Sequence, residues 1–189
     1  PFVYAIILNL FRGNYGFHED KRIRKMVDDI LSKYSITSFV ETGTARGDTA
    51  YYMAKKYPEL DIWTCEPNYF LFKIAQKRLG KEKNVVYLNS EEMLNNLFFR
   101  FGNLPFFFLD AHNKGKNPLK EELKIINKNF QKAIILIDDI VLKEPMEGIN
   151  HLADIKHLLD NYKLIPRLPS SSTGYLLSFK GITLKGLIY

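Results

Sequence analysis

The fold of this chain is decided by the stretch Ser38-Phe39-Val40-Glu41-Thr42-Gly43-Thr44-Ala45-Arg46-Gly47-Asp48-Thr49. Phe39 and Val40 are aromatic and β-branched, as a buried strand prefers. Gly43 and Gly47 allow a tight turn and the close approach of a ligand, and Asp48 or Thr49 can cap a following helix. The stretch therefore predicts a strand, a turn and a helix whose first N–H groups face a nucleotide-like ligand.

Composition places the chain among folded globular proteins with one sizeable core. It has 189 residues, of which 46% are hydrophobic and 25% are charged. The net charge is +6, but the lysines are spread along helices and form no basic run interleaved with aromatic residues. This distribution makes nucleic acid an unlikely partner.

Two further features bear on where the protein works. Cys65 is the single cysteine, so there is no disulfide framework, and we expect a reducing, cytoplasmic location. The opening apolar run, Pro1 to Leu8, is far shorter than the roughly 20 residues of a membrane span and lacks the basic leader of a signal peptide. We expect a packing segment there and no membrane span.

Strand-like apolar runs alternate with helix-like segments along the whole chain. We expect further strands at 60–66, 84–89, 105–110, 133–139, around 164–165 and at 175–179, and helices at 18–34, 48–57, 67–80, 90–97, 118–130 and 150–162. This alternation predicts an α/β fold with an open, mostly parallel, doubly wound sheet and helices on both faces. Residues 1–189 form a single domain, in which 1–37 are an N-terminal segment and helix and 38–189 the Rossmann-like core.

Acidic residues follow four of the first five predicted strands. They are Glu41, Glu66, Asp110 and the pair Asp138-Asp139. Ligands of such sheets bind beyond the carboxyl ends of the strands, and acids crowded at one edge repel one another unless a ligand or metal uses them. The pattern therefore predicts a binding site at this edge.

Glu66 has the position of a ribose-binding acid. It follows Gly47 by 19 residues, near the spacing at which an acid meets ribose hydroxyls in nucleotide-binding α/β folds. The alternative role is a helix-capping acid beside Pro67. The glycine turn has Ala45 and Arg46 where G-x-G-x-x-G is expected, which disfavours a nicotinamide-dependent oxidoreductase.

On these residues the chain resembles the class I S-adenosylmethionine-dependent methyltransferases. The resemblance covers about residues 39–179, and it implies a seven-stranded sheet with the last strand antiparallel. It implies that the cofactor, S-adenosylmethionine, is bound by Glu41, Gly43, Thr44, Gly47, Glu66, Ser90, Glu91 and Asp110. Ala45 replaces the commoner middle glycine of the family's first motif.

Within that class, two motifs are similar to those of the metal-dependent O-methyltransferases, the catechol and antibiotic-sugar type. These are Leu109-Asp110-Ala111-His112 and Leu136-Ile137-Asp138-Asp139. The resemblance implies that Asp110, Asp138 and Asp139 hold Mg²⁺ or a related ion. A hard cation prefers carboxylate oxygens, and it lowers the pKa of a bound hydroxyl so that the oxygen can attack a methyl group. Alternatively, Asp110 is a general cofactor-pocket acid and Asp138 and Asp139 are loop caps.

His112 is the candidate general base beside Asp110. It follows Asp110 by two positions, so it can serve as a base or a metal ligand, although a histidine in a loop is often only a solvated side chain. Lys114 and Lys116 are weaker candidates for the same role.

The leading hypothesis is metal-assisted O-methylation of a small hydroxylated acceptor, such as a sugar or a phenol. Residues 110–113 lack the Asn/Asp-Pro-Pro-aromatic motif of nucleic-acid amino-methyltransferases. Two alternatives remain open, a metal-independent methyltransferase and a non-catalytic cofactor-binding module. The sequence also leaves a homo-oligomer open.

Overall fold

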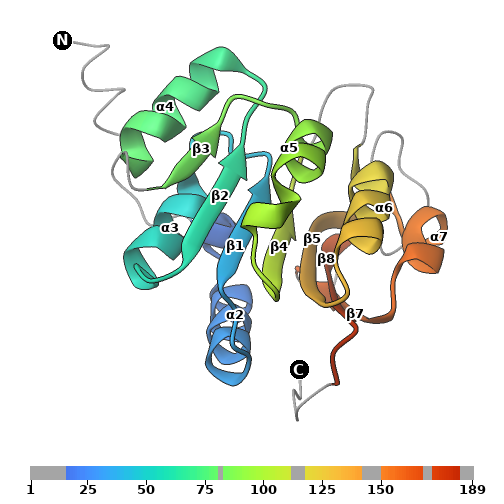
Figure 1. Ribbon diagram of the computed structural model, residues 1–189. Coiled ribbons are helices and arrows are strands. Elements are labelled where there is room, and N and C mark those ends of the chain that lie inside the picture. The colour runs from blue at the N-terminus through green and yellow to red at the C-terminus, as the bar shows by residue number, and fades with distance from the viewer. Residues whose placement is uncertain (1–15, 81–82, 112–117, 142–149, 168–171, 184–189) are drawn as a thin grey trace.

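The computed structural model describes residues 16–80, 83–111, 118–141, 150–167 and 172–183, and of residues 150 and 151 only the backbone. Figure 1 shows one twisted β-sheet with helices on both faces. The strands are hydrogen-bonded in the order β3-β2-β1-β4-β5-β8-β7, and the two-residue strand β6 pairs with β5.

The elements follow the predicted alternation. The strands are β1 (Ser38–Thr42), β2 (Asp61–Cys65), β3 (Asn84–Val86), β4 (Pro105–Leu109), β5 (Ala133–Val141), β6 (Asn150–His151), β7 (Asn161–Pro166) and β8 (Thr173–Lys180). The α-helices are α2 (Lys21–Lys33), α3 (Asp48–Lys56), α4 (Tyr69–Leu79), α5 (Ser90–Leu97), α6 (Leu119–Asn129) and α7 (Leu152–Ile155). Short 3₁₀ turns are η1 (Gly16–Glu19), η2 (Phe98–Arg100) and η3 (Lys156–Leu158).

Strand direction confirms the predicted sheet. β1 pairs in parallel with β2 and β4, β2 with β3, and β4 with β5. β8, the last strand, runs antiparallel to both β5 and β7. The carboxyl ends of β1, β2, β4 and β5 therefore meet at one edge, which is where the acidic residues were expected.

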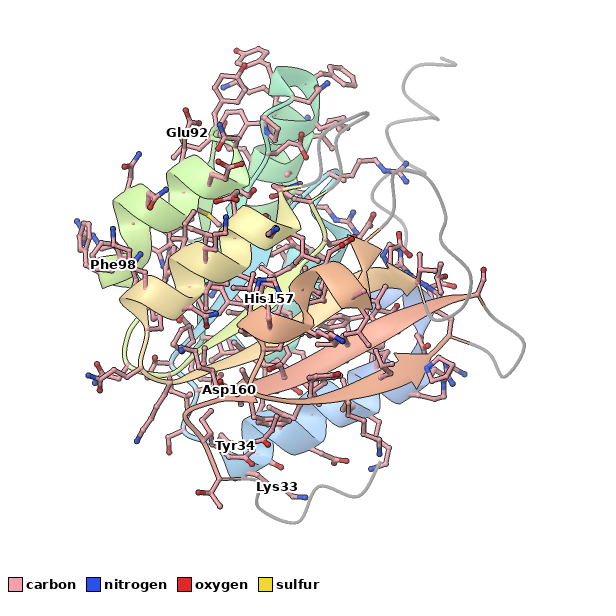
Figure 2. The ribbon with its side chains drawn as sticks, turned by 90° about the vertical axis from the view of Figure 1, so that its right-hand side faces the viewer. Lys33, Tyr34, Glu92, Phe98, His157 and Asp160 are labelled. Carbon is pink, nitrogen blue, oxygen red and sulfur yellow. The ribbon has the colours of Figure 1, made fainter. Side chains whose placement is uncertain are left out.

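The three phenylalanines of β4 show why this strand lacks alternation. Phe106 and Phe108 pack into a core cluster with α2 and α3, whereas Phe107 packs into a second cluster with α5 and α6. All three are fully buried because helices cover both faces of the sheet. Figure 2 shows these two layers from the side, with Lys33 and Tyr34 at the end of α2 on one face and His157 toward the other.

The predicted helix at 150–162 is wrong. Only α7 and η3 are helical there, and Asn161 and Tyr162 already belong to β7, where they pair with Phe179 and Ser178 of β8. Pairing with the sheet overrides the helical spacing of the apolar residues. Asn89 caps α5 in a reciprocal pair with Glu92, and Ser90 is the first residue of that helix. No helix within the described residues combines the length and apolar character needed to cross a bilayer.

Candidate functional site

The glycine turn after β1 requires glycine at its first position. Gly43 has φ +82°, and a Cβ atom there would lie 2.6 Å from the Asp110 carbonyl oxygen. The ends of β1 and β4 are joined at this point, since the Asp110 N–H donates to the Thr42 carbonyl at 3.1 Å. Gly47, with φ +79°, is the N-cap residue of α3 and provides no side-chain cap, so the prediction that Asp48 or Thr49 caps this helix is wrong. The turn thus brings bare backbone to the edge of the sheet.

Glu41 is buried at the base of this turn. Its Oε2 accepts a hydrogen bond of 2.7 Å from the Thr64 hydroxyl, which also contacts the Thr44 hydroxyl. Burial raises the pKa of Glu41 to about 8, and the Thr64 hydroxyl offsets this only in part. Glu41 is therefore mostly protonated at neutral pH, and a cation bound nearby would favour its ionised form.

Glu66 fixes the conformation of the turn. Its Oε2 accepts from the Ala45 N–H at 2.8 Å, and its Oε1 accepts from the Asn68 N–H at 2.9 Å. This is the backbone-capping role of a buried acid. Each carboxylate oxygen has a second lone pair, so the contacts leave capacity for a ligand hydroxyl.

A cavity of about 450 Å³ opens beside the turn, a size typical of small-ligand sites. Four acids and two basic residues are among its described lining, which consists of His18, Glu19, Glu41, Gly43, Thr44, Ala45, Arg46, Asp48, Thr49 and Asp110. Of the predicted cofactor residues, Glu41, Gly43, Thr44 and Asp110 line this cavity. Glu66 lies behind it, bound to the backbone of Ala45.

Ser90 and Glu91 lie apart from this lining, in the first turn of α5. Ser90 is buried next to Glu122 of α6. Burial raises the pKa of Glu122 to about 7, and the Ser90 and Thr42 hydroxyls oppose that rise. Sequence reasoning missed this buried acid, because Glu122 follows an ordinary helical pattern of charged residues.

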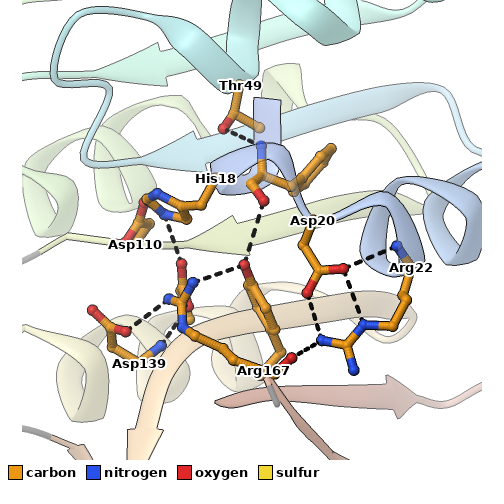
Figure 3. Close-up of polar contacts among 10 residues, drawn as sticks. His18, Asp20, Arg22, Thr49, Asp110, Asp139 and Arg167 are labelled. Carbon is orange, nitrogen blue, oxygen red and sulfur yellow. Dashed lines mark hydrogen bonds and ion pairs between the residues drawn. The ribbon is translucent and has the colours of Figure 1, made fainter. Parts of the chain in front are cut away.

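A second group of charged side chains gathers where β4 and β5 end. His18 Nε2 lies 2.9 Å from Asp138 Oδ2 and 3.5 Å from Asp110 Oδ2 (Figure 3). The Asp110 and Asp138 carboxylates raise the pKa of His18 to about 10, against the opposing effect of burial, so the imidazole is protonated. One ligand atom from each of these three residues lies within 4.8 Å of the other two, a spacing that suits a single metal ion.

Asp139 points to a different partner. Its Oδ1 lies 2.7 Å from Arg167 Nη2, which also contacts Asp138 Oδ1 (Figure 3). The pairing of β5 with β8 shifts register between Ile137 and Ile140, so Asp138 and Asp139 form a β-bulge, and Asp139 has φ +51°. A bulge redirects side chains, and here it separates the two carboxylates. Asp139 is outside the group formed by His18, Asp110 and Asp138.

Sequence reasoning missed His18 and Arg167. Both are separated from the carboxylates by long stretches of chain, and only the fold of the N-terminal segment and of β7 brings them together. The excess of acids at the strand ends was the only hint in the sequence, because acids placed close together need positively charged partners. His112, Lys114 and Lys116 lie outside the described residues.

Comparison with known proteins places the fold. Models of protein families and curated protein sequences give no match to this chain. A Staphylococcus aureus protein assigned as a caffeoyl-CoA O-methyltransferase superposes with a TM-score of 0.65 at 13% identity, over 94% of this chain and 91% of its own. Cofactor-bound Rv0187 from MTB superposes with a TM-score of 0.65 at 15% identity, over 97% of this chain and 91% of its own.

A Nostoc punctiforme protein assigned as an O-methyltransferase gives a TM-score of 0.59 at 10% identity. The match covers 82% of this chain but 55% of that protein, so this chain spans about half of its length. The similarity in all three cases is one of fold. The chain has the Rossmann-like fold of the class I methyltransferases.

Proposed function

We propose that this protein transfers a methyl group from S-adenosylmethionine to a small hydroxylated acceptor, such as a sugar or a phenol. The observation that carries the proposal is the acid-rich cavity beside the glycine turn. Glu19, Glu41, Asp48 and Asp110 all line it. S-adenosylmethionine carries a sulfonium and an ammonium group, which Glu19, Asp48 and Asp110 attract, and a carboxylate, which Arg46 of the same lining attracts.

The residues of the turn fit this cofactor. Gly43 provides the space for a ligand to approach the backbone, because a side chain there would collide with Asp110. Glu41 and Asp110 face the cationic part, and Glu66, fixed by the turn, accepts from the ribose. Ser90 and Glu91 belong to the adenine end of the proposed site. The bound cofactor supplies an electrophilic methyl group to the acceptor.

We further propose a divalent ion at the second group of charges. Asp110 and Asp138 fit this role, because one carboxylate oxygen of each lies within 4.8 Å of the other and of His18 Nε2. Asp139, predicted as a third ligand, serves instead to hold Arg167. The ion supplies a positive charge that lowers the pKa of an acceptor hydroxyl, and open positions remain for that hydroxyl and water.

The acceptor class rests on two supports. Two of the similar structures are assigned as O-methyltransferases. In addition, residues 110–113 do not carry the motif of nucleic-acid amino-methyltransferases. His112 stays the proposed general base, since it follows Asp110 by two residues.

Isothermal titration calorimetry tests the cofactor. We expect S-adenosylmethionine to bind the wild-type protein and Glu66→Gln to weaken binding by about tenfold or more, equivalent to about 1.4 kcal/mol. Glu91→Gln, at another residue predicted to bind the cofactor, serves as the control, and we expect it to weaken S-adenosylmethionine binding less than Glu66→Gln does. NAD binding, or S-adenosylmethionine binding that is unchanged in Glu66→Gln, would contradict the proposal.

A non-catalytic module is separated from an enzyme by turnover. The protein, loaded with radiolabelled S-adenosylmethionine, is mixed with panels of sugars and phenols, and methylated product is counted. Tight cofactor binding with no product in any panel would contradict the proposed methyl transfer and support a non-catalytic cofactor-binding module.

A further inference from the structure

The η1 turn holds an unusual backbone next to the acidic residues. Phe17, His18 and Glu19 have φ values of +54°, +52° and +63°, so three consecutive non-glycine residues are left-handed. Such a conformation is unfavourable for each of them and persists only where the surroundings impose it. It therefore calls for an explanation at His18, the residue in the middle.

The anchor of this turn is Phe17. Its ring is fully buried and packs edge-to-face against Phe39, Tyr52 and Phe108. Its N–H donates to the Thr49 hydroxyl at 3.1 Å. The η1 turn is thereby held against β1, α3 and β4, and His18 is directed toward the ends of β4 and β5.

The contacts of His18 are with the two carboxylates proposed to bind an ion. Its Nε2 is 2.9 Å from Asp138 Oδ2 and 3.5 Å from Asp110 Oδ2. The Asp138 side chain is completely buried. A nitrogen and two oxygens thus converge on a single point, as ligand atoms around an ion do.

Arg167 and His18 contact different parts of this acidic group. Arg167 already contacts both Asp138 and Asp139 from the end of β7, and its guanidinium lies 4.7 Å above the Tyr175 ring. Asp138 therefore divides its oxygens, Oδ1 toward Arg167 and Oδ2 toward His18. Asp139 contacts Arg167, and the third possible metal ligand beside Asp110 and Asp138 is the His18 nitrogen.

We propose that His18, whose Nε2 proton the ion displaces into solvent, is the third protein ligand of the divalent ion, together with Asp110 and Asp138. The inference rests on the proposed function, and it replaces the predicted set of three carboxylates with one nitrogen and two oxygens. Imidazole suits transition ions such as Fe²⁺, Ni²⁺ and Zn²⁺, whereas an all-oxygen site suits Mg²⁺ and Mn²⁺. The site accordingly prefers a transition ion to Mg²⁺.

The test uses Mn²⁺ as a probe on the metal-stripped full chain. Titration followed by electron paramagnetic resonance gives the affinity, and electron spin echo modulation detects a ¹⁴N nucleus bound to Mn²⁺. We expect one Mn²⁺ per chain with a ¹⁴N signal. In His18→Gly the signal should disappear and the affinity should fall at least tenfold, while glycine keeps the left-handed backbone of the turn. The melting temperature of the metal-free variant separately reports the loss of the ion pair with Asp138.

Two further variants sharpen the result. His157→Ala removes an exposed histidine of η3 and should keep both the signal and the affinity. His18→Asp restores an oxygen ligand, so Mn²⁺ binding should recover in part and the preference over Mg²⁺ should decrease.

Three outcomes would overturn the inference: no Mn²⁺ binding to the wild type, a ¹⁴N signal that persists in His18→Gly, or unchanged Mn²⁺ affinity in that variant. S-adenosylmethionine calorimetry on the same metal-free samples separates the two proposals. Cofactor binding without any Mn²⁺ binding leaves the methyltransferase proposal intact and refutes the role of His18.

Discussion

Two parts of the sheet edge where β1, β2, β4 and β5 end are built in different ways. At the end of β1, a continuous stretch from Glu41 to Gly47 makes the turn, and Glu66 of the neighbouring strand fixes it through two backbone N–H groups. At the ends of β4 and β5, the site is made of charged side chains from four separate segments, including His18 and Arg167. The first part depends on backbone conformation, and the second on balanced charge.

This difference corresponds to two proposed roles: the turn at the end of β1 binds the cofactor, and the charged side chains at the ends of β4 and β5 serve the reaction. A backbone cradle tolerates few substitutions at its glycines, but its geometry follows from local sequence. A charge network depends on contacts between Asp138 and residues more than 25 positions away in the chain. The molecule therefore keeps its proposed cofactor site in one contiguous motif and assembles its proposed reaction site from the whole fold.

Gly43→Ala, in the turn after β1, should lower the unfolding free energy more than the other variants. Its Cβ would meet backbone atoms at 2.6 and 2.8 Å, and the φ of +82° adds strain, so we expect a loss of about 3 kcal/mol in unfolding free energy. Urea denaturation measures it. Gly47→Ala is the matched control, with a similar φ but ordinary Cβ contacts of 3.4 Å, and it should cost only about 1 kcal/mol. Equal losses in the two variants would show that the close approach to Asp110 is unimportant.

Arg167→Met should weaken the second part of the edge by a smaller amount. It removes the donor shared by Asp138 and Asp139, and hydrogen bonds to charged groups of this kind are worth about 2 kcal/mol. Because Asp139 is then released toward the ion, Mn²⁺ affinity should rise as stability falls. Lys25→Met, which removes an exposed pair with Asp29, should change stability by less than about 1 kcal/mol. A fall in both stability and Mn²⁺ affinity would argue against the release of Asp139.

The pH dependence of Glu41 gives the smallest effect. Its pKa is about 8 in the folded protein and 4.5 ordinarily, so the unfolded chain ionises first as pH rises. The stability of the wild type relative to Glu41→Gln should thus be greatest below pH 4.5 and fall by more than about 1 kcal/mol between pH 5 and pH 8. Thermal unfolding of both proteins across this range measures it, and a difference independent of pH would show that Glu41 ionises normally in its buried position.

Much of the fold could be predicted from the sequence, because the strands of a doubly wound sheet are apolar runs bounded by turns. The buried phenylalanines of β4 and the glycine turn both followed from local chemistry. The helix predicted at 150–162 failed because Asn161 pairs with Phe179 of β8, a contact that no local pattern reveals.

The site was predictable only in its carboxylates. Strand ends identified Glu41, Asp110 and Asp138 from their positions alone. The roles of His18 and Arg167 depend on a left-handed turn and on a β-bulge, and both are consequences of packing between distant segments. The split between Asp138 and Asp139 could not be read from two adjacent aspartates for the same reason.

The most direct test of the account is a crystal structure of the protein with S-adenosylhomocysteine and Mn²⁺, with anomalous diffraction used to locate the ion. The account predicts the nucleoside product in the cavity of Glu41 and Gly43, with its ribose at Glu66, and an anomalous peak between His18, Asp110 and Asp138. A cofactor bound elsewhere, or an occupied cofactor site with no peak beside Asp110 and Asp138, would contradict it.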